Sequence, residues 1–327
     1  MADRLRWGIL ATGWIAELFT QDLLMAGHAI AAVGSRSQAS ADRFAARFGI
    51  GTAHGSYEAL AADPDVDIIY VATPHPMHAG NALMALNAGK HVLIEKPFTI
   101  NAAEAQAIVE LAARQGLVAL EAMWTRFLPH MVRIREIVAS GVLGDVRSVL
   151  ADHTRDLPDD PSHRLNALEL GGGALLDLGI YPISFAVDIL GIPTEISAMA
   201  RFKSTGADAE VATIFRHAGG AMSVTLSTSD NGGPNVATIL GTKGRIAIDS
   251  TWYVPTSFRV YDSRDVVIEE YHSSVEGRGM QYQAAEMERL VAAGLPGGEI
   301  LPPSETVAIM QTLDTIRRQI GLRYPSE

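Results

Sequence analysis

Residues 7–16 carry the sequence WGILATGWIA, which has the pattern of a buried strand that runs into the first turn of a helix. The turn follows the dinucleotide-binding fingerprint GxGxxG or GxGxxA, with Ala11, Gly13 and Ala16 in its three defining positions. Gly13 lets the backbone approach a pyrophosphate, and the free N–H groups at the start of the helix attract that group. A tight structural turn without a ligand is the alternative, because Ala11 replaces the first glycine. The candidate cofactor-binding residues of this turn are Ala11, Thr12, Gly13, Trp14 and Ile15.

The first 122 residues alternate short apolar runs with helical patterns. The run at residues 68–72 is continuously apolar, which is typical of a strand in a parallel sheet covered on both faces. The alternation predicts an N-terminal Rossmann domain over residues 1–122, an α/β fold with a doubly wound parallel sheet and ligands at the carboxyl ends of its strands. Strands are expected at residues 5–11, 29–35, 67–73, 91–95 and 117–122, and helices at residues 14–26, 39–48, 78–88 and 101–114.

The pattern changes after residue 122. Strand-like runs follow one another with short turns, which indicates a large, mostly antiparallel open sheet in an α+β domain. Residues 123–327 are therefore expected to form a substrate-binding and dimerisation domain. Strands are expected at residues 196–201, 211–216, 221–227, 236–240, 245–249, 258–261 and 266–271, and helices at residues 129–140, 173–190, 281–293 and 304–320.

Composition narrows the function. The chain has 327 residues, with 26 Lys and Arg against 37 Asp and Glu, so its formal net charge is −11. An acidic protein repels polyphosphates, which argues against nucleic acid as a partner. There is no cysteine, so disulfides, thiolate metal sites and a cysteine nucleophile are excluded. His75 and His78 stand three residues apart, but no third ligand is apparent and no metal site is expected.

The longest run without charged residues covers residues 68–89. It contains Pro74, Pro76 and four His and Asn residues that would be costly in lipid, so no membrane span is expected. A cytoplasmic location is the default expectation.

The end of the second expected strand bears on the choice of cofactor. In NAD-binding Rossmann domains an Asp or Glu at this place accepts hydrogen bonds from the ribose 2′-OH. This chain has Ser35 there, followed by Arg36. A neutral hydroxyl does not repel a 2′-phosphate, and a guanidinium can pair with it. The two residues favour NADP, with NAD as the alternative. A second alternative is that Arg36 is an exposed loop residue that binds no ligand.

Two further strand ends are expected at the ligand crevice. The one after residue 72 has the sequence TPHPMH, and the one after residue 93 has IEKP. A surface lysine is the alternative for Lys96. Trp124 and Arg126 follow the last strand of this domain and either line the cofactor and substrate pocket or pack the domain junction. The candidate cofactor-binding residues of this region are Thr73, Pro74, His75, His78, Glu95, Lys96, Pro97, Trp124 and Arg126.

Four stretches resemble one known family. They are AGKHVLIEKP at residues 88–97, EAMWTRF at residues 121–127, GGGALLDLGIYP at residues 171–182 and RRQIGL at residues 317–322. Together they resemble the glucose–fructose oxidoreductase / inositol dehydrogenase (Gfo/Idh/MocA) family over the whole chain. The branch they resemble contains dimeric dihydrodiol dehydrogenases and NADP-dependent D-xylose 1-dehydrogenases. The resemblance implies a homodimer or larger homo-oligomer, and it implies that Lys96 and Tyr181 are the catalytic pair.

The chemistry of these residues agrees with that implication. A free tyrosine has a pKa of about 10, too high for a good base, and a nearby ammonium lowers it. Asp177 stands four residues before Tyr181, so on a helix both side chains share a face. Its expected role is to orient the substrate or Lys96; a helix-capping carboxylate and, for Tyr181, a core aromatic are the alternatives.

The chain departs from the family pattern in two places. One is Ala11; the other is residues 153–155, where HTR stands in place of an aromatic stretch that the branch commonly has. That region should line the substrate pocket, so the substrate is the open question, and a solvated loop is the alternative. The candidate substrate-binding residues are Trp124, His153, Arg155 and Arg164.

The sequence thus predicts an NADP-dependent oxidoreductase that moves a hydride between nicotinamide and an alcohol or hemiacetal carbon of a small carbohydrate, polyol or trans-diol. An aldose–aldose oxidoreductase that never releases its cofactor is the alternative among enzymes, and an NADP-binding sensor without chemistry is the alternative outside them. Residues 221–227 alternate apolar and hydroxyl side chains, so the sheet is expected to leave one face open for a second copy of the chain.

Overall fold

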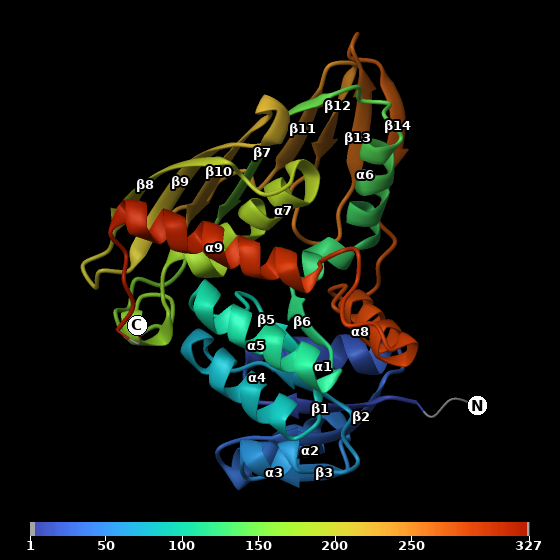
Figure 1. Cartoon of the computed structure of the whole chain (residues 1–327), viewed down its shortest axis with the longest axis vertical. Helices are drawn as coiled ribbons and strands as arrows, with labels where there is room; N and C mark the ends of the chain where they lie inside the picture. The colour runs from blue at the N-terminus through green and yellow to red at the C-terminus, as the bar shows by residue number, and fades with distance from the viewer. Residues whose placement is uncertain (1–3, 326) are drawn as a thin grey trace. The chain divides into compact units, whose positions relative to one another are not determined.

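The computed structural model describes residues 4–325 and 327. The chain forms two compact units (Figure 1). Unit 1 holds the chain up to Trp124 together with Glu276–Val307, and unit 2 holds Thr125–Val275 and Ala308–Glu327. The expected division at residue 122 left the whole later chain in one domain, whereas the structure groups Glu276–Val307 with the N-terminal unit.

Unit 1 contains a six-stranded sheet in which every neighbouring pair is parallel. Its strand order is β3-β2-β1-β4-β5-β6, so the direction of winding switches between β1 and β4. This is the doubly wound Rossmann arrangement that the sequence predicted. The strands are β1 (Arg6–Leu10), β2 (Ala29–Gly34), β3 (Thr52–His54), β4 (Ile68–Val71), β5 (His91–Glu95) and β6 (Ala119–Ala122).

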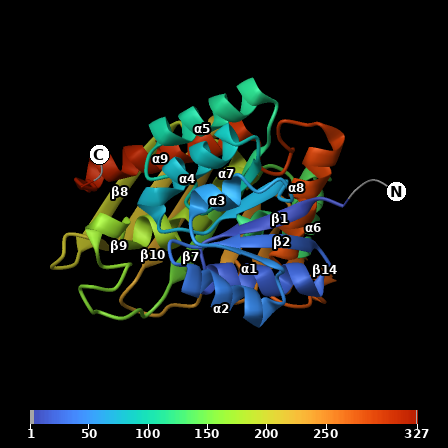
Figure 2. The same cartoon turned by 90° about the horizontal axis from the view of Figure 1, so that it is seen from below.

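Helices cover both faces of this sheet, with α1 and α2 on one face and α4 and α5 on the other (Figure 2). That cover explains why β4 is buried along its whole length. The short elements β3 and α3 were not expected, because they span only three and five residues, which is too few for a periodic pattern to stand out. The helices are α1 (Trp14–Met25), α2 (Gln38–Phe48), α3 (Tyr57–Ala61), α4 (His78–Asn87), α5 (Ala102–Gln115) and α8 (Gln281–Ala293).

Side-chain contacts fasten the returning segment that contains α8 to the start of the chain. Glu288 Oε1 accepts a hydrogen bond from Trp7 Nε1 at 2.8 Å and lies 2.8 Å from His28 Nδ1. Asp22 Oδ2 accepts one from the Met280 backbone N–H at 2.8 Å. These contacts join residues more than 250 positions apart, so no local sequence pattern predicts them.

Unit 2 contains an eight-stranded sheet in the order β14-β13-β12-β11-β7-β10-β9-β8. The expected run of consecutive antiparallel neighbours is interrupted, because β7 lies between β10 and β11 and pairs with β10 in parallel. The sheet is otherwise antiparallel. The strands are β7 (Val146–Thr154), β8 (Glu195–Phe202), β9 (Asp208–Arg216), β10 (Met222–Thr228), β11 (Ala237–Gly241), β12 (Gly244–Ile248), β13 (Phe258–Asp262) and β14 (Val267–Tyr271).

Helix α7 packs on β7 and β10 and buries one face of this sheet (Figure 1). Ser223, Thr225 and Ser227 alternate along β10 and are buried, as is Thr228 at its end, while Met222 and Val224 on the other face are exposed. The polar side of the strand is thus the covered one. The helices of this unit are α6 (Pro129–Ala139), α7 (Ile180–Leu190) and α9 (Pro303–Ile320) from Ala308 onward, and a π-helical turn, η4 (Leu175–Gly179), precedes α7.

Within the described part of the chain, one helical segment, Leu168–Leu190, has the length and apolar composition of a membrane span. It is 83% buried inside the protein over its apolar window. That burial is what the core helix of a folded domain shows.

Candidate active site

The candidate residues lie in two groups, one in each unit. In unit 1 the turn between β1 and α1 presents an open helix start. Gly13 is the N-cap of α1 with no side-chain cap, and a Cβ added there would meet nothing within 4 Å. Gly13 and Trp14 are exposed, while Thr12 and Ile15 are partly buried. The free N–H groups of the first turn and the open space beside them fit a pyrophosphate.

Ala11 adopts φ = 91°, in the left-handed region that favours glycine. Its backbone N–H donates to the Gly34 carbonyl oxygen at 2.9 Å, which ties the turn to the end of β2. The chain therefore keeps the backbone course of the fingerprint although it lacks the first glycine. The departure costs backbone strain and does not change the fold.

Ser35 and Arg36 follow β2 directly. Ser35 is buried, and its backbone N–H donates to His54 O at 3.0 Å. Arg36 is exposed and lies beside Tyr57. Burial raises the pKa of Tyr57, and the positive charge of the Arg36 guanidinium opposes that rise. A guanidinium thus stands at the strand end where a 2′-phosphate would need one.

His78 joins the ends of two strands. Its ring nitrogens lie 2.8 Å from Thr73 O, after β4, and 2.9 Å from Pro97 O, after β5. Asn81 Nδ2 adds a hydrogen bond to Thr73 Oγ1 at 3.1 Å. Complete burial lowers the pKa of His78, which favours the neutral ring. His75 is also buried, with its ring 5.7 Å from that of His78.

Lys96 is partly buried, and buried acidic residues hold the chain on either side of it. Glu95 precedes it and accepts a hydrogen bond from the Tyr70 hydroxyl. The Phe98 backbone N–H, two residues later, donates to Glu121 Oε1 at 3.1 Å, and the Lys96–Pro97 peptide is cis. These contacts fix the backbone on either side of Lys96 at the end of β5.

An arginine that the sequence did not single out completes this region. The Arg278 guanidinium carbon lies 5.5 Å from the centre of the exposed Trp14 ring and 5.0 Å from that of the buried Trp124 ring. The Arg278 backbone N–H donates to Asp22 Oδ1 at 3.1 Å. Its place in unit 1 follows from the returning segment, for which the sequence carried no signal.

In unit 2 Tyr181 stands at the start of α7 and is buried. Its ring centre lies 4.9 Å from that of His153, edge to face, and 5.5 Å from that of Tyr253. His153 stacks on Tyr253 at 3.8 Å. Tyr253 was missed, because it lies in an irregular segment between strands. The three rings form one cluster, called here the ring cluster.

Asp177 lies on the π-helical turn η4, four residues before Tyr181. Turns of this kind are frequent at functional sites. The side chain of Asp177 is buried and lies 3.3 Å from Arg164 Nη1. Burial raises the pKa of the Tyr253 phenol, and the positive charge of the exposed Arg155 opposes that rise, which places Arg155 beside the ring cluster. The structure therefore brings Asp177, Tyr181 and three candidate substrate residues, His153, Arg155 and Arg164, together in one unit.

Arg126 has the contacts of a packing residue. It is 3% exposed, and its Nη1 lies 3.0 Å from Asp188 Oδ1 on α7. It also donates to Ser184 Oγ at 3.0 Å, while Arg135 pairs with Asp188 at 2.9 Å. These contacts favour the packing interpretation of Arg126 over the pocket interpretation. Over residues 4–325 and 327, no group of three or more His, Asp or Glu residues could hold a metal ion.

A Rossmann unit with an open first turn, joined to a sheet unit with a buried Tyr and Asp on one helix start, defines a pyridine-nucleotide oxidoreductase. The chain belongs to the Gfo/Idh/MocA oxidoreductase family. The model described as "Oxidoreductase family, NAD-binding Rossmann fold" matches residues 5–122, and the "GFO/IDH/MocA C-terminal domain" matches residues 131–247.

Full-length relatives support this assignment. Trans-1,2-dihydrobenzene-1,2-diol dehydrogenase of Mus musculus is 38% identical over 333 residues, and that of Homo sapiens is 33% identical over 345 residues; both alignments cover 99% of each chain. Among solved structures, KijD10, a 3-ketoreductase from Actinomadura kijaniata in complex with NADP and TDP-benzene, has a TM-score of 0.86 and 26% identity over 97% of this chain and 98% of its own. An aldose–aldose oxidoreductase from Caulobacter crescentus shares the fold, with a TM-score of 0.87 and 24% identity over 97% of both chains.

The family resemblance, the fold class and the oxidoreductase class predicted from the sequence are confirmed. The roles of individual residues stay predictions.

Proposed function

We propose that the protein is an NADP-dependent dehydrogenase that acts on a CH–OH group of a small sugar, polyol or trans-diol. The observation that carries the proposal is the placement of Tyr181, with Asp177 one helical turn before it, beside the rings of His153 and Tyr253. A phenol at the edge of a polar and aromatic cluster is suited to exchange a proton with a bound hydroxyl. The names of the diol dehydrogenase relatives and of the NADP-bound 3-ketoreductase support the same reaction type.

The residues of unit 1 fit NADP. The open start of α1 at Gly13 would hold the pyrophosphate, and Ser35 and Arg36 would hold the 2′-phosphate. When bound, NADP accepts or donates the hydride. The residues after β4 and β5, with Trp14 and Arg278, are the proposed surroundings of the nicotinamide half.

Tyr181 is the proposed group that takes the hydroxyl proton during oxidation and returns it during reduction. Lys96 is the proposed cation that favours the phenolate form of Tyr181. Asp177 is proposed to accept a hydrogen bond from the substrate. Lys96 and Tyr181 belong to different units, and the proposal is that they act on one substrate.

A turnover screen tests the reaction. Aldoses, polyols and trans-diols are supplied with NADP, and NADPH formation is followed by absorbance. Sustained formation with several turnovers per protein supports a dehydrogenase that releases its cofactor. Oxidation of one sugar coupled to reduction of another, without free NADPH, would favour the aldose–aldose alternative. Tight NADPH binding with no turnover on any of these compounds would favour the sensor.

We further propose that two copies of the chain associate through the open face of the sheet of unit 2. Val224 pairs with Leu150 on one side and Ile214 on the other, and the three side chains are 42–49% exposed. Met199 on β8 is 79% exposed. A row of apolar side chains across three strands is what a symmetric homo-oligomeric interface needs.

Light scattering at micromolar concentration tests the assembly. A mass of two or more chains is expected, and Val224→Lys should shift it toward one chain, whereas Val267→Lys at the edge strand β14 should not. A wild type of monomer mass contradicts the proposal. We also propose a cytoplasmic location, which cell fractionation with a compartment marker tests.

A further inference from the structure

The segment between β7 and the π-helical turn, residues 155–172, carries Arg164. The guanidinium donates from Nη1 and Nη2 to Asp177 Oδ1 at 3.3 and 3.4 Å. The Arg164 side chain is 50% exposed, while that of Asp177 is 8% exposed. The pair therefore presents hydrogen-bond donors to solvent over a mostly buried acceptor, in the same unit as Tyr181.

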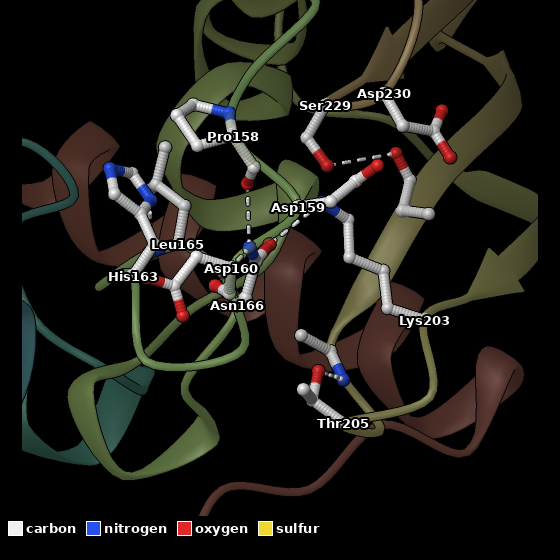
Figure 3. Close-up of polar contacts among 12 residues, drawn as sticks. Pro158, Asp159, Asp160, His163, Leu165, Asn166, Lys203, Thr205, Ser229 and Asp230 are labelled. Atoms are coloured by element: carbon white, nitrogen blue, oxygen red, sulfur yellow. Dashed lines mark hydrogen bonds and ion pairs between the residues drawn. The ribbon is translucent and has the colours of Figure 1, made fainter.

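A single buried amide organises this segment. Asn166 is 1% exposed, and its Nδ2 donates to Pro158 O at 2.7 Å and to Asp160 O at 2.8 Å (Figure 3). Its Oδ1 accepts from Lys203 Nζ at 2.7 Å. Lys203 lies in the turn after β8, with its side chain 11% exposed and Asp159 Oδ1 3.8 Å from its Nζ. We call the Asn166–Lys203 contact the latch.

The residues that follow this turn also fix the position of Asp177, the partner of Arg164. Asp208, fully buried at the start of β9, accepts from the Leu175 backbone N–H at 2.6 Å, two residues before Asp177. Gly173 leaves no room between them, because a Cβ there would collide with the Asp208 carboxylate. One turn thus fixes the segment that carries Arg164 and the helix start that carries Asp177.

These contacts restrict the segment to one arrangement. A buried amide or ammonium that loses its partner costs more free energy than the hydrogen bond contributes, so alternative arrangements are disfavoured. A binding group held in this way is preorganised, which is what recognition requires.

We propose that Arg164 and Asp177 bind hydroxyl groups of a polyhydroxylated, uncharged substrate beyond the reacting hydroxyl and its vicinal neighbour, and that Asn166, Lys203 and Asp208 are positioning residues for this pair. A guanidinium only donates and a carboxylate only accepts, while a sugar hydroxyl does both. The two opposite charges lie together, so the pair attracts an anion weakly. The substrate assignment rests on the proposed function.

The first test compares two substrates. Wild type and Arg164→Gln are assayed with NADP on D-xylose and on trans-cyclohexane-1,2-diol, with Arg264→Gln, an exposed arginine in a turn of the same unit, as control. Removal of a charged donor should lower kcat/KM for the sugar by roughly 10–100-fold, mainly through KM, and that for the diol by less than about threefold.

Equal losses on both substrates, or no loss on either, would overturn the assignment of Arg164. A wild type that oxidises neither compound would overturn the proposed function with it. A wild type that oxidises the diol and not the sugar would overturn the substrate class alone.

The second test addresses the latch without catalysis. Trypsin cleaves after Arg155 and Arg164, and cleavage requires the segment to open locally. Lys203→Met should raise the cleavage rate by about fivefold, the scale of one lost hydrogen bond. Lys203→Arg, which keeps a donor, should restore most of the protection, and the exposed Lys243→Met should match the wild type.

Activity completes this second test. Lys203→Met should also raise KM for the sugar and leave kcat/KM for the diol within about threefold. Unchanged cleavage and unchanged KM for the sugar in a folded Lys203→Met protein would contradict the positioning role. Asn166→Ser is the second variant, since it removes the same contact from the other side.

Discussion

The two units fix their candidate functional groups by different means. In the Rossmann unit Ser35 and Lys96 stand directly after strands, and the backbone of the sheet places them. In the sheet unit the helix start that carries Tyr181 is fixed by side chains remote in sequence, such as Asp208, which binds the Leu175 N–H 33 residues away. Groups of the first kind can be located by a motif, whereas groups of the second kind depend on tertiary contacts and should be sensitive to distant substitutions.

The largest effect should come from breaking the chemistry that the two units are proposed to share. Tyr181→Phe and Lys96→Met should each lower kcat by roughly 10²–10⁴-fold, because a general acid–base contribution is lost. The double variant should be little worse than the worse single one, since the two groups act together. Stopped-flow NADPH formation measures this, with Tyr282→Phe on α8 as the control. Near-normal turnover of Tyr181→Phe would move the proton transfer to another residue.

The next effect tests whether side chains hold α7 in unit 2. Asp188 pairs with the buried Arg126 and with Arg135, so Asp188→Asn leaves two cations without their counter-charge. The free energy of unfolding should fall by about 3–5 kcal/mol. The matched control is Asp145→Asn, whose partner Arg147 is exposed, with an expected change below about 0.5 kcal/mol. Urea unfolding measures both, and equal effects would contradict the comparison.

Two buried titratable groups of unit 2, Asp208 and His130, should make the free energy of unfolding depend on pH. Burial raises the pKa of Asp208 from 3.8 to about 6, so between these values the native state binds more protons than the unfolded state. This group therefore lowers stability as the pH rises from about 4 to 6, by about 3 kcal/mol in all. Burial lowers the pKa of His130 from 6.5 to about 4, which has the opposite sign: stability rises with pH over that range.

Single substitutions separate the contributions of Asp208 and His130 to the change in the free energy of unfolding with pH. Asp208→Asn should leave a curve that rises from pH 4 to 6, and His130→Gln should leave one that falls. Denaturant unfolding at several pH values measures each curve. A curve for Asp208→Asn with the wild-type slope would show that the Asp208 carboxyl titrates normally.

The smallest effect concerns the group that the backbone of unit 1 places. Ser35→Asp sets a carboxylate where the 2′-phosphate is proposed to bind, and NADP affinity should fall by about 1–3 kcal/mol. Ser35→Thr keeps the hydroxyl and should change little. Fluorescence titration with NADPH and NADH measures the preference, and equal affinity of the wild type for both would contradict the NADP assignment.

Prediction from the sequence succeeded in both units where the signal is local in the chain, and it failed where the signal depends on contacts between distant residues. The strands of the Rossmann unit could be predicted because continuous apolar runs mark parallel strands, and β5 agrees with its expected bounds at both ends. The middle position of β7 could not, because strand order in a sheet is set by contacts between residues far apart in the chain. For the same reason Arg278 and Tyr253 were missed, while Tyr181 was found through its motif.

The π-helical turn η4 has a consequence for helical phase. A π-helical turn takes up one more residue than an α-helical turn, and each residue of an α-helix advances the side chains by about 100°. Deletion of Leu178 or Gly179 would leave the sequence of α7 unchanged and yet rotate Tyr181 by about that angle relative to Asp177. A single-residue gap at this place among related sequences therefore changes which side chains face the ring cluster, even where the flanking residues are identical.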